Sequence, residues 1–130
     1  MEHTKDILNK EDIKRFVDSF YSKVRTDNLL APIFNERIND RWPQHLEKMY
    51  SFWTTVLLAE NSYRGNLFPP HELPFDQSHF VRWLGLFREA IDESFQGEKA
   101  TEAKWRAKKM AEIFESKSEY YKKQGVKNLL

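Results

Sequence analysis

The sequence predicts an all-α protein, and three observations lead to that prediction. Apolar residues recur with helical spacing in four long segments of the chain. No segment shows the strict alternation of apolar and polar residues that is typical of a half-buried strand. No internal repeat or low-complexity tract competes with the helical pattern. Because 130 residues suit one core, we expect residues 1–130 to form a single domain with four principal helices and at least one shorter helix.

The first helix is predicted to follow Asn9 and to end before Asp27. The side chain of Asn9 can cap the first turn, and Glu11 and Asp12 in that turn are favourable to the helix dipole. The apolar stripe of this helix consists of Ile13, Phe16, Val17, Phe20, Tyr21 and Val24. The apolar segment LLAPIFN that follows is predicted to be a buried turn or a single helical turn.

The second long helix is predicted to be capped by Asn39 or Asp40, with Pro43 tolerated in its first turn. Its apolar stripe consists of Trp42, Leu46, Met49, Phe52, Trp53, Val56 and Leu57. His45 falls on the same stripe, one turn before Met49.

Residues 60–76 show no sustained hydrophobic period and are rich in proline, so we expect an ordered loop there. His71 lies in this loop, directly behind Pro69 and Pro70 and before Pro74. A long loop inside a compact domain is often functional. The loop is therefore either a connector between two helices or a segment that presents an imidazole.

Two further helices are predicted after this loop. The third begins at about Ser78 and ends near Gly97, and the fourth runs from about Lys99 to Lys123 with Gly125 as a C-terminal stop. The apolar residues of the third are Phe80, Trp83, Leu84, Phe87, Ile91 and Phe95. The inward residues of the fourth are Ala103, Ala107, Met110, Ala111, Phe114 and Tyr121.

The composition excludes several classes of site. The chain has 21 Lys and Arg against 20 Asp and Glu, spread along its length, which argues against nucleic acid or an anionic membrane as the main partner. The absence of cysteine excludes disulfides, thiolate metal ligands and cysteine nucleophiles, and it suits a reducing cytoplasm. No signal peptide or membrane span is evident. We therefore expect a soluble cytoplasmic protein.

Motifs of common helical metal sites and of hydrolases are missing. A di-iron bundle needs two Glu-x-x-His pairs, and the chain offers only the sequence Asp76-Gln-Ser-His79, once and at a helix start. The zinc-protease pattern His-Glu-x-x-His, a glycine-rich phosphate loop and a nucleophile elbow are absent from the sequence. A different kind of site has to be considered.

Tyr21, His45 and Trp83 each lie on the apolar stripe of a different predicted helix. Each carries a hydrogen-bonding atom that needs a partner if it is buried. Taken singly, each is more often an ordinary core residue, and a loop histidine such as His71 is more often solvated. The aromatic content of 15% suits a small helical core and equally a pocket for a large flat ligand. These residues alone leave both interpretations open.

Four blocks of the sequence, in order, resemble the truncated haemoglobins, and specifically their third group. The blocks are SFYSKVRTDNLLAPIFN, WPQHLEKMYSFWTTVLL, YRGNLFPPHELPF and FVRWLGLFREAID. The resemblance extends from roughly Asp12 to Met110, and the glycine-pair motifs of other truncated globins are absent here, as they are in that group. The resemblance implies a two-on-two globin fold, a helical sandwich around a haem.

The resemblance also implies roles for individual residues. His71 matches the proximal ligand of the haem iron. Tyr21 and Trp83 match distal hydrogen-bond donors above the haem. His45 matches the distal histidine or gate position, where it could donate a hydrogen bond, gate ligand entry or ligate the iron itself.

The implied cofactor is haem b, with Met49 against the haem face and Phe34 against the porphyrin edge. The implied ligands are dioxygen, nitric oxide and carbon monoxide. Because several distal donors would slow oxygen release, we expect scavenging, sensing, or redox chemistry with nitric oxide or peroxide rather than bulk oxygen transport. Nitric-oxide dioxygenase or peroxidase-like activity, an electron-donating reductase and a monomer or weak dimer belong to this expectation. The alternative is a haem-free, globin-shaped interaction module.

Overall fold

The computed structural model describes residues 5–58 and 75–128, with side chains as far as residue 116. The described residues form α1 (Lys10–Thr26), α2 (Ala31–Ile38), the 3-10 helix η1 (Asn39–Arg41), α3 (Trp42–Leu58), α4 (Gln77–Asp92) and α5 (Glu98–Asn128). The only β-type pairing within these ranges is an isolated bridge between Lys5 and Phe95. The predicted all-α class is confirmed. The predicted loop 60–76 lies outside the described residues except for its last two positions.

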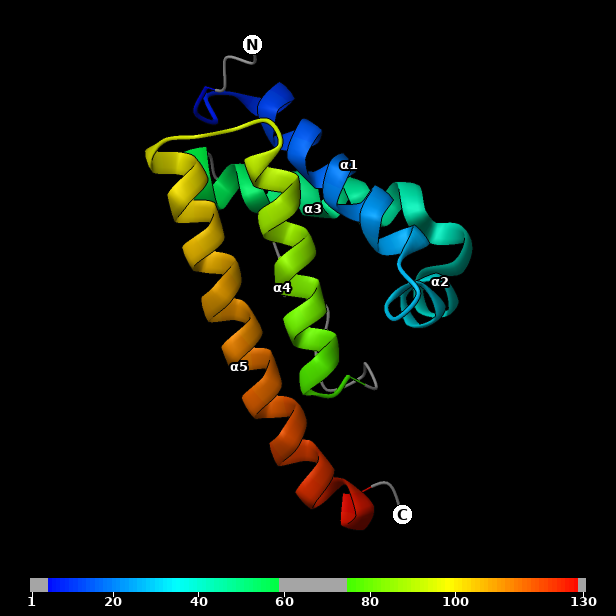
Figure 1. Cartoon of the computed structure of the whole chain (residues 1–130). Coiled ribbons are helices and arrows are strands. Elements are labelled where there is room, and N and C mark those ends of the chain that lie inside the picture. The colour runs from blue at the N-terminus through cyan, green and yellow to red at the C-terminus, as the bar shows by residue number, and fades with distance from the viewer. Residues whose placement is uncertain (1–4, 59–74, 129–130) are drawn as a thin grey trace.

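The long helices pack against one another in the spatial order α3, α1, α4 and α5. α1 packs against α3 and against α4, and α4 packs against α5. Figure 1 shows α4 and α5 side by side and antiparallel, with α1 lying in front of α3 at one end of that pair. This arrangement brings the apolar stripe of α1 between two other helices, which is why nearly the whole stripe is enclosed.

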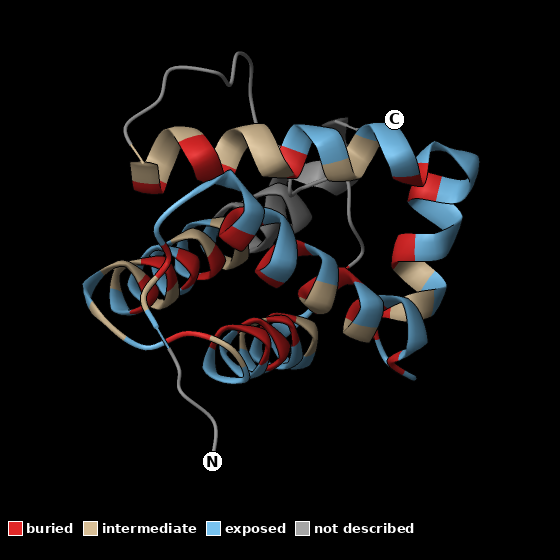
Figure 2. Ribbon diagram, turned by 90° about the horizontal axis from the view of Figure 1, so that it is seen from above, coloured by how far each residue is buried: buried red, intermediate tan, exposed pale blue. Residues whose placement is uncertain are grey.

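Aromatic rings fill most of this core. All six residues predicted for the stripe of α1 are buried, and Figure 2 shows buried residues along the inward sides of the helices. Phe87 of α4 lies between Trp53 and Trp83 in a nearly parallel stack, with ring centroids 5.2 and 6.0 Å away. Phe16 of α1 meets Trp53 and Phe87 edge-on, both at 5.7 Å. Such ring pairs add about 0.5–1.5 kcal/mol each to the burial term.

The start of α5 is fixed by a residue from the other end of the chain. The carboxylate of Asp6 accepts hydrogen bonds from the backbone N–H groups of Lys99 and Ala100, both at 2.9 Å. Gly97 precedes this helix with a φ of 143°, and a Cβ atom there would lie 2.6 Å from Cγ of Asp6. Only glycine fits this close approach, so the segment before α1 and the start of α5 are held together.

The region between α1 and α3 differs from the prediction. α2 is an eight-residue helix rather than a turn or a single helical turn. It begins without a side-chain cap, which removes the signal by which such a helix is usually recognised. Asn39, expected to cap the next helix, instead ends α2 with a φ of 54° and starts η1.

The predicted ends of the last two helices were also wrong. α4 ends at Asp92 rather than near Gly97, because Phe95 leaves the helix and pairs with the backbone of Lys5 while staying buried. Phe95 follows Ile91 by four residues, which is also the spacing of neighbours on one face of a helix, so the sequence pattern placed Phe95 in the helix. α5 continues beyond Lys123 and through Gly125 to Asn128.

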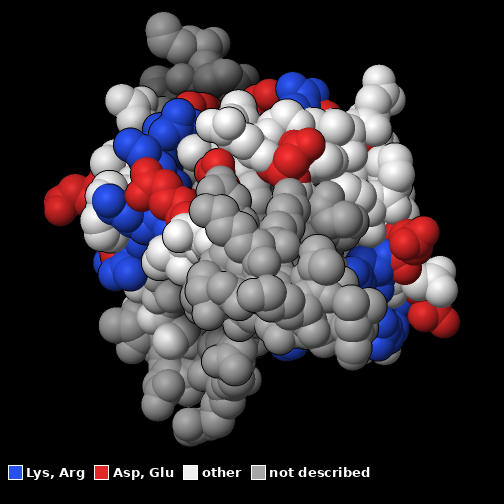
Figure 3. Space-filling model, turned by 90° about the horizontal axis from the view of Figure 1, so that it is seen from below, with Lys and Arg blue, Asp and Glu red and all other residues white. Residues whose placement is uncertain are grey.

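Charged side chains of both signs lie close together on the described part of the surface seen in Figure 3. This face carries no continuous basic area among the described residues. No described helix combines the length and apolarity needed to cross a membrane.

Candidate functional site

Tyr21 is the centre of a group of buried rings contributed by three helices. Its side chain points from α1 toward α3 and is 4% exposed. Its ring centroid lies 5.0 Å from that of His45, 5.7 Å from Trp42 and 6.3 Å from Phe34, in edge-on contacts. Burial raises the pKa of Tyr21. The phenol is therefore protonated at neutral pH and can donate a hydrogen bond.

His45 brings an unsatisfied polar atom to this group. Its Nε2 is buried and has no hydrogen-bond partner among the described residues. Burial, together with the positive charge of Lys48, lowers the pKa of His45 from 6.5 to about 4, so the imidazole is neutral at physiological pH. A buried polar atom without a partner costs about 1–3 kcal/mol. Such an atom indicates a place where a bound group supplies the missing partner.

Trp83 reaches the same group from α4 through the ring of Phe20. Phe20 lies 4.7 Å from Tyr21 and 5.6 Å from Trp83, measured between ring centroids. The residue before Trp83 is Arg82, whose Nε donates a 2.6 Å hydrogen bond to the carboxylate of Asp27. This bond joins α4 to the C-terminal end of α1, at the position directly before Trp83.

Phe34 of α2 closes another side of the group and contacts Phe75. Their ring centroids are 5.7 Å apart. Phe75 also stacks on His79, with centroids 5.1 Å apart and planes 14° apart. Asp76 caps α4 by accepting from the backbone N–H of His79, whose ring Nδ1 in turn lies 3.0 Å from the backbone nitrogen of Asp76. The Asp76–His79 pair, considered above as a metal motif, is a helix cap.

The structure brings Tyr21, Phe34 and His45 into direct ring contact and connects Trp83 to them through Phe20. Met49 is buried one turn after His45 and so lies on the same face of α3. The predicted iron ligand, His71, lies outside the described residues. No group of three or more His, Asp or Glu side chains in the described ranges could hold a metal ion.

Three residues of the group were not singled out from the sequence, namely Phe20, Trp42 and Phe75. The periodicity placed Phe20 and Trp42 on apolar stripes but could not distinguish them from other core aromatics. Phe75 gave no signal, since it stands between a predicted loop and a predicted helix. The assembled group is a cluster of aromatic rings that holds one neutral imidazole and one phenol.

Comparisons with known proteins agree with this arrangement. Residues 6–116 match the family model described as bacterial-like globin. Group 3 truncated hemoglobin ctb of Campylobacter jejuni is 35% identical over 116 residues, which cover 85% of this chain and 91% of that protein. The crystal structure of group III truncated hemoglobin from Campylobacter jejuni matches with a TM-score of 0.77 and 34% identity, covering 88% of this chain and 94% of that one.

An all-helical fold that brings a phenol and an imidazole together among buried aromatic rings is typical of the globins. The chain belongs to the bacterial-like globin family and, within it, to the truncated haemoglobins of group III. Membership implies a haem cofactor and the binding of diatomic gases.

The described residues fit a haem. A porphyrin is large, flat and mostly apolar, and the walls formed by Phe34, Trp42 and Trp83 are buried aromatic surfaces. The orphan Nε2 of His45 is a polar atom for which the described residues provide no partner. The predicted pocket residues Tyr21 and Met49 are buried as well.

Proposed function

We propose that the chain binds haem b with His71 as the iron ligand and retains dioxygen through hydrogen bonds from Tyr21 and Trp83. The observation that supports this most directly is the contact between Tyr21 and His45. Their rings lie 5.0 Å apart at 88°, and the Nε2 atom of His45 is buried without a partner. Two hydrogen-bonding groups among aromatic rings are suited to a small polarised ligand.

A bound haem supplies an iron that takes up diatomic gases, and the distal side chains then decide how firmly the gas is held. Hydrogen bonds to a charged acceptor contribute about 1.5–3 kcal/mol each, so two of them slow release by a factor on the order of 10² or more. Such retention is unfavourable for bulk oxygen transport. It suits a scavenger, a sensor, or redox chemistry with nitric oxide or peroxide supported by an electron-donating reductase.

His71 is proposed as the ligand from its sequence context. A neutral imidazole is a common axial ligand of haem iron, and its second nitrogen needs an acceptor that fixes the ring. Pro69, Pro70 and Pro74 restrict the backbone on both sides of His71, so less entropy is lost when the imidazole is held in one place. Met49 is proposed to contact the haem face and Phe34 its edge.

The absorption spectrum of the purified, haem-reconstituted protein tests this proposal. We expect a Soret band that weakens or disappears in His71→Ala. The control is His3→Ala, since His3 precedes the residues matched by the globin family. The spectra of the ferric, ferrous and oxygenated forms also establish whether His45 ligates the iron when no gas is bound.

An unchanged haem spectrum in His71→Ala would refute the ligand assignment while leaving haem binding intact. Protein that stays colourless after reconstitution would overturn the proposal as a whole and favour the haem-free interaction module.

A further inference from the structure

The outward face of α5 carries large side chains, whereas its inward face carries small ones. The inward residues are alanines at positions 100, 103, 107 and 111, each at most 5% exposed. The opposite face presents Trp105 and Ile113, which are 56% and 52% exposed. The other three tryptophans of the chain are at most 6% exposed. Trp105 is therefore the one tryptophan that folding leaves in contact with solvent.

Trp105 lies at the centre of a continuous row of side chains, which we call the outward ridge of α5. The ridge consists of Glu98, Glu102, Trp105, Lys109 and Ile113. Successive members are four, three, four and four positions apart, so they share one face of the helix. Nζ of Lys109 lies 5.7 Å from the ring centroid of Trp105. The ridge is thus acidic before the tryptophan and basic directly after it.

An open groove of about 840 Å³ follows the acidic half of the ridge. Trp105 forms its wall at one end, and its remaining lining consists of Gln96, Gly97, Glu98, Lys99, Thr101 and Glu102. Two carboxylates against one ammonium group make this lining negative, which favours a basic side chain as the occupant. The basic half of the same ridge offers a long lysine and an isoleucine.

The ridge is complementary to a second copy of itself. A two-fold axis that crosses α5 midway between positions 102 and 109 makes the two helices antiparallel. Glu102 then faces the partner's Lys109, and Lys109 faces the partner's Glu102. The midpoint lies beside Trp105, so the two tryptophan rings meet next to the axis, where an aromatic pair is favourable. By the same symmetry, Glu98 faces the partner's Ile113 at each end.

The ion pairs within one chain are compatible with this contact. Glu102 accepts from Nε of Arg106 at 2.8 Å, and its carboxylate has about four lone-pair sites, so it can also accept from a lysine of a second copy. Nζ of Lys109 lies 3.6 Å from the carboxylate of Glu112 in an exposed pair, which contributes little. The formal net charge of +1 imposes little long-range repulsion between two copies.

We propose that the outward ridge is the contact surface of a weak, antiparallel two-fold dimer of this chain. A partner with charges of one sign would be repelled by one half of the ridge, whereas a second copy matches both halves. The ridge is short, so the contact buries less than the roughly 1,200 Å² of a stable complex, and the dimer dissociates readily.

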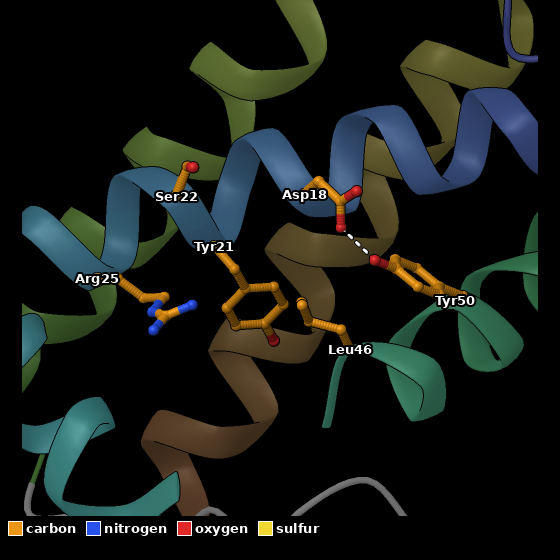
Figure 4. A pocket seen from close by; sticks show the side chains of 6 residues that line it. All are labelled: Asp18, Tyr21, Ser22, Arg25, Leu46 and Tyr50. Atoms are coloured by element: carbon orange, nitrogen blue, oxygen red, sulfur yellow. Dashed lines mark hydrogen bonds between the residues drawn. The ribbon is translucent and has the colours of Figure 1, made fainter. Parts of the chain in front are cut away.

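The dimer is independent of the proposed haem function. The ridge lies on α5 (Figure 1) and shares no residue with the aromatic cluster around Tyr21, whose side chain points from α1 toward α3 (Figure 4). The variants used to test the dimer should therefore keep the haem spectrum of the unmodified protein.

Two charge reversals test the dimer and its register. In Glu102→Lys two lysines face each other across the interface, and in Lys109→Glu two glutamates do. Each variant alone should therefore associate with itself at least about tenfold more weakly than wild type. In an equimolar mixture every pair again joins a lysine to a carboxylate, so mixed dimers should form within about threefold of the wild-type affinity. Sedimentation velocity of the haem-reconstituted 130-residue chain measures these affinities.

Trp105→Ala tests the centre of the contact. We expect self-association to weaken at least about tenfold, since a central aromatic residue carries much of the affinity of an interface. The matched control is Val81→Ala, at a 64% exposed residue of α4. Glu36→Lys, at an exposed position of α2, repeats the charge change of Glu102→Lys. Both controls should stay within about twofold of wild type, and circular dichroism verifies that every variant is folded.

A wild-type chain that stays monomeric up to about 1 mM would overturn the dimer. Self-association of Trp105→Ala at the wild-type affinity would exclude the ridge as the contact. A mixture of the two charge variants that associates no better than either variant alone would exclude the antiparallel register. The Soret band of the unmodified protein is a separate measurement, and its absence would refute the proposed haem function without affecting the dimer.

Discussion

Arg82 and Asp27 are joined by a 2.6 Å hydrogen bond, although 55 positions separate them in the chain. The side chain of Asp27 is 4% exposed, whereas that of Arg82 is 55% exposed. The same carboxylate accepts from the backbone N–H groups of Leu29 and Leu30, at 3.1 and 3.0 Å. One buried carboxylate therefore orders the turn after α1 and ties α4 to it.

Asp27→Ala should destabilise the protein considerably more than Arg82→Ala. Removing the carboxylate leaves two backbone donors without an acceptor, and we expect the free energy of unfolding to fall by about 2–4 kcal/mol. Removing the exposed guanidinium should cost about 1 kcal/mol. Urea denaturation followed by circular dichroism measures both variants, and equal losses would contradict this account.

The contribution of Asp27 should also disappear in acid. Burial by itself would raise the pKa of Asp27, but the hydrogen bonds from Arg82, Leu30 and Leu29 outweigh it and lower the pKa below its ordinary value of 3.8. The folded protein therefore binds this proton less readily than the unfolded chain. The stabilisation is present above pH 3.8 and is lost as the pH falls through the lower folded-state pKa. The difference in the free energy of unfolding between wild type and Asp27→Ala should therefore shrink as the pH falls below 3.8.

Gly97→Ala and Gly85→Ala should have effects of opposite sign. At Gly97 the positive φ and the 2.6 Å approach to Asp6 both oppose a side chain, and we expect a loss of about 2 kcal/mol or more. Gly85 lies within α4, and a Cβ there would meet nothing within 4 Å. Its replacement should stabilise by about 0.5–1 kcal/mol. Thermal unfolding of both variants provides the check; a stabilised Gly97→Ala would disprove the close approach.

His45 should make the haem-free protein less stable as the pH falls from 6.5 toward 4. The folded-state pKa of about 4 is lower than the ordinary 6.5, so the unfolded chain binds more protons in this window and stability rises with pH. The slope from this one group can reach about 1.4 kcal/mol per pH unit. His45→Leu should flatten the dependence in urea titrations across this window. The same slope in both proteins would contradict burial of a neutral imidazole.

Tyr21→Phe should release oxygen at least about tenfold faster, because the ring contacts remain while the donor is lost. Stopped-flow displacement of oxygen by carbon monoxide measures this rate in the haem-loaded protein. Tyr50→Phe is the matched control: it removes a hydroxyl that is bonded to Asp18 outside the pocket. An unchanged rate in Tyr21→Phe would refute its role as a donor.

Much of the helical core follows from local pattern. The stripe of α1 and its cap at Asn9 could be predicted because both depend on residues within a few positions of one another. The end of α4 could not, because Phe95 is buried by contacts with the N-terminal segment that no local spacing reveals. The capping of α5 by Asp6, across 93 positions or more, is equally invisible to local analysis.

The candidate site likewise contains features that the sequence pattern predicts and others that depend on contacts between distant residues. Periodicity placed Tyr21, His45 and Trp83 on inward faces, and the family resemblance suggested that they share a pocket. Their contacts through Phe20 and Trp42 required the packing of three helices, since interchangeable aromatic residues occur on every stripe. The unsatisfied Nε2 of His45 is a property of the folded interior and has no counterpart in sequence.

The contact between Asp6 and α5 also determines when the fold can be completed. During synthesis Asp6 leaves the ribosome early, and the backbone groups that it caps appear only after more than ninety further residues. Until then its carboxylate has no helix to cap, and the beginning of α5 has no partner of its own. The cap of α5 can therefore form only after residues 99 and 100 have been synthesised and have met the segment before α1.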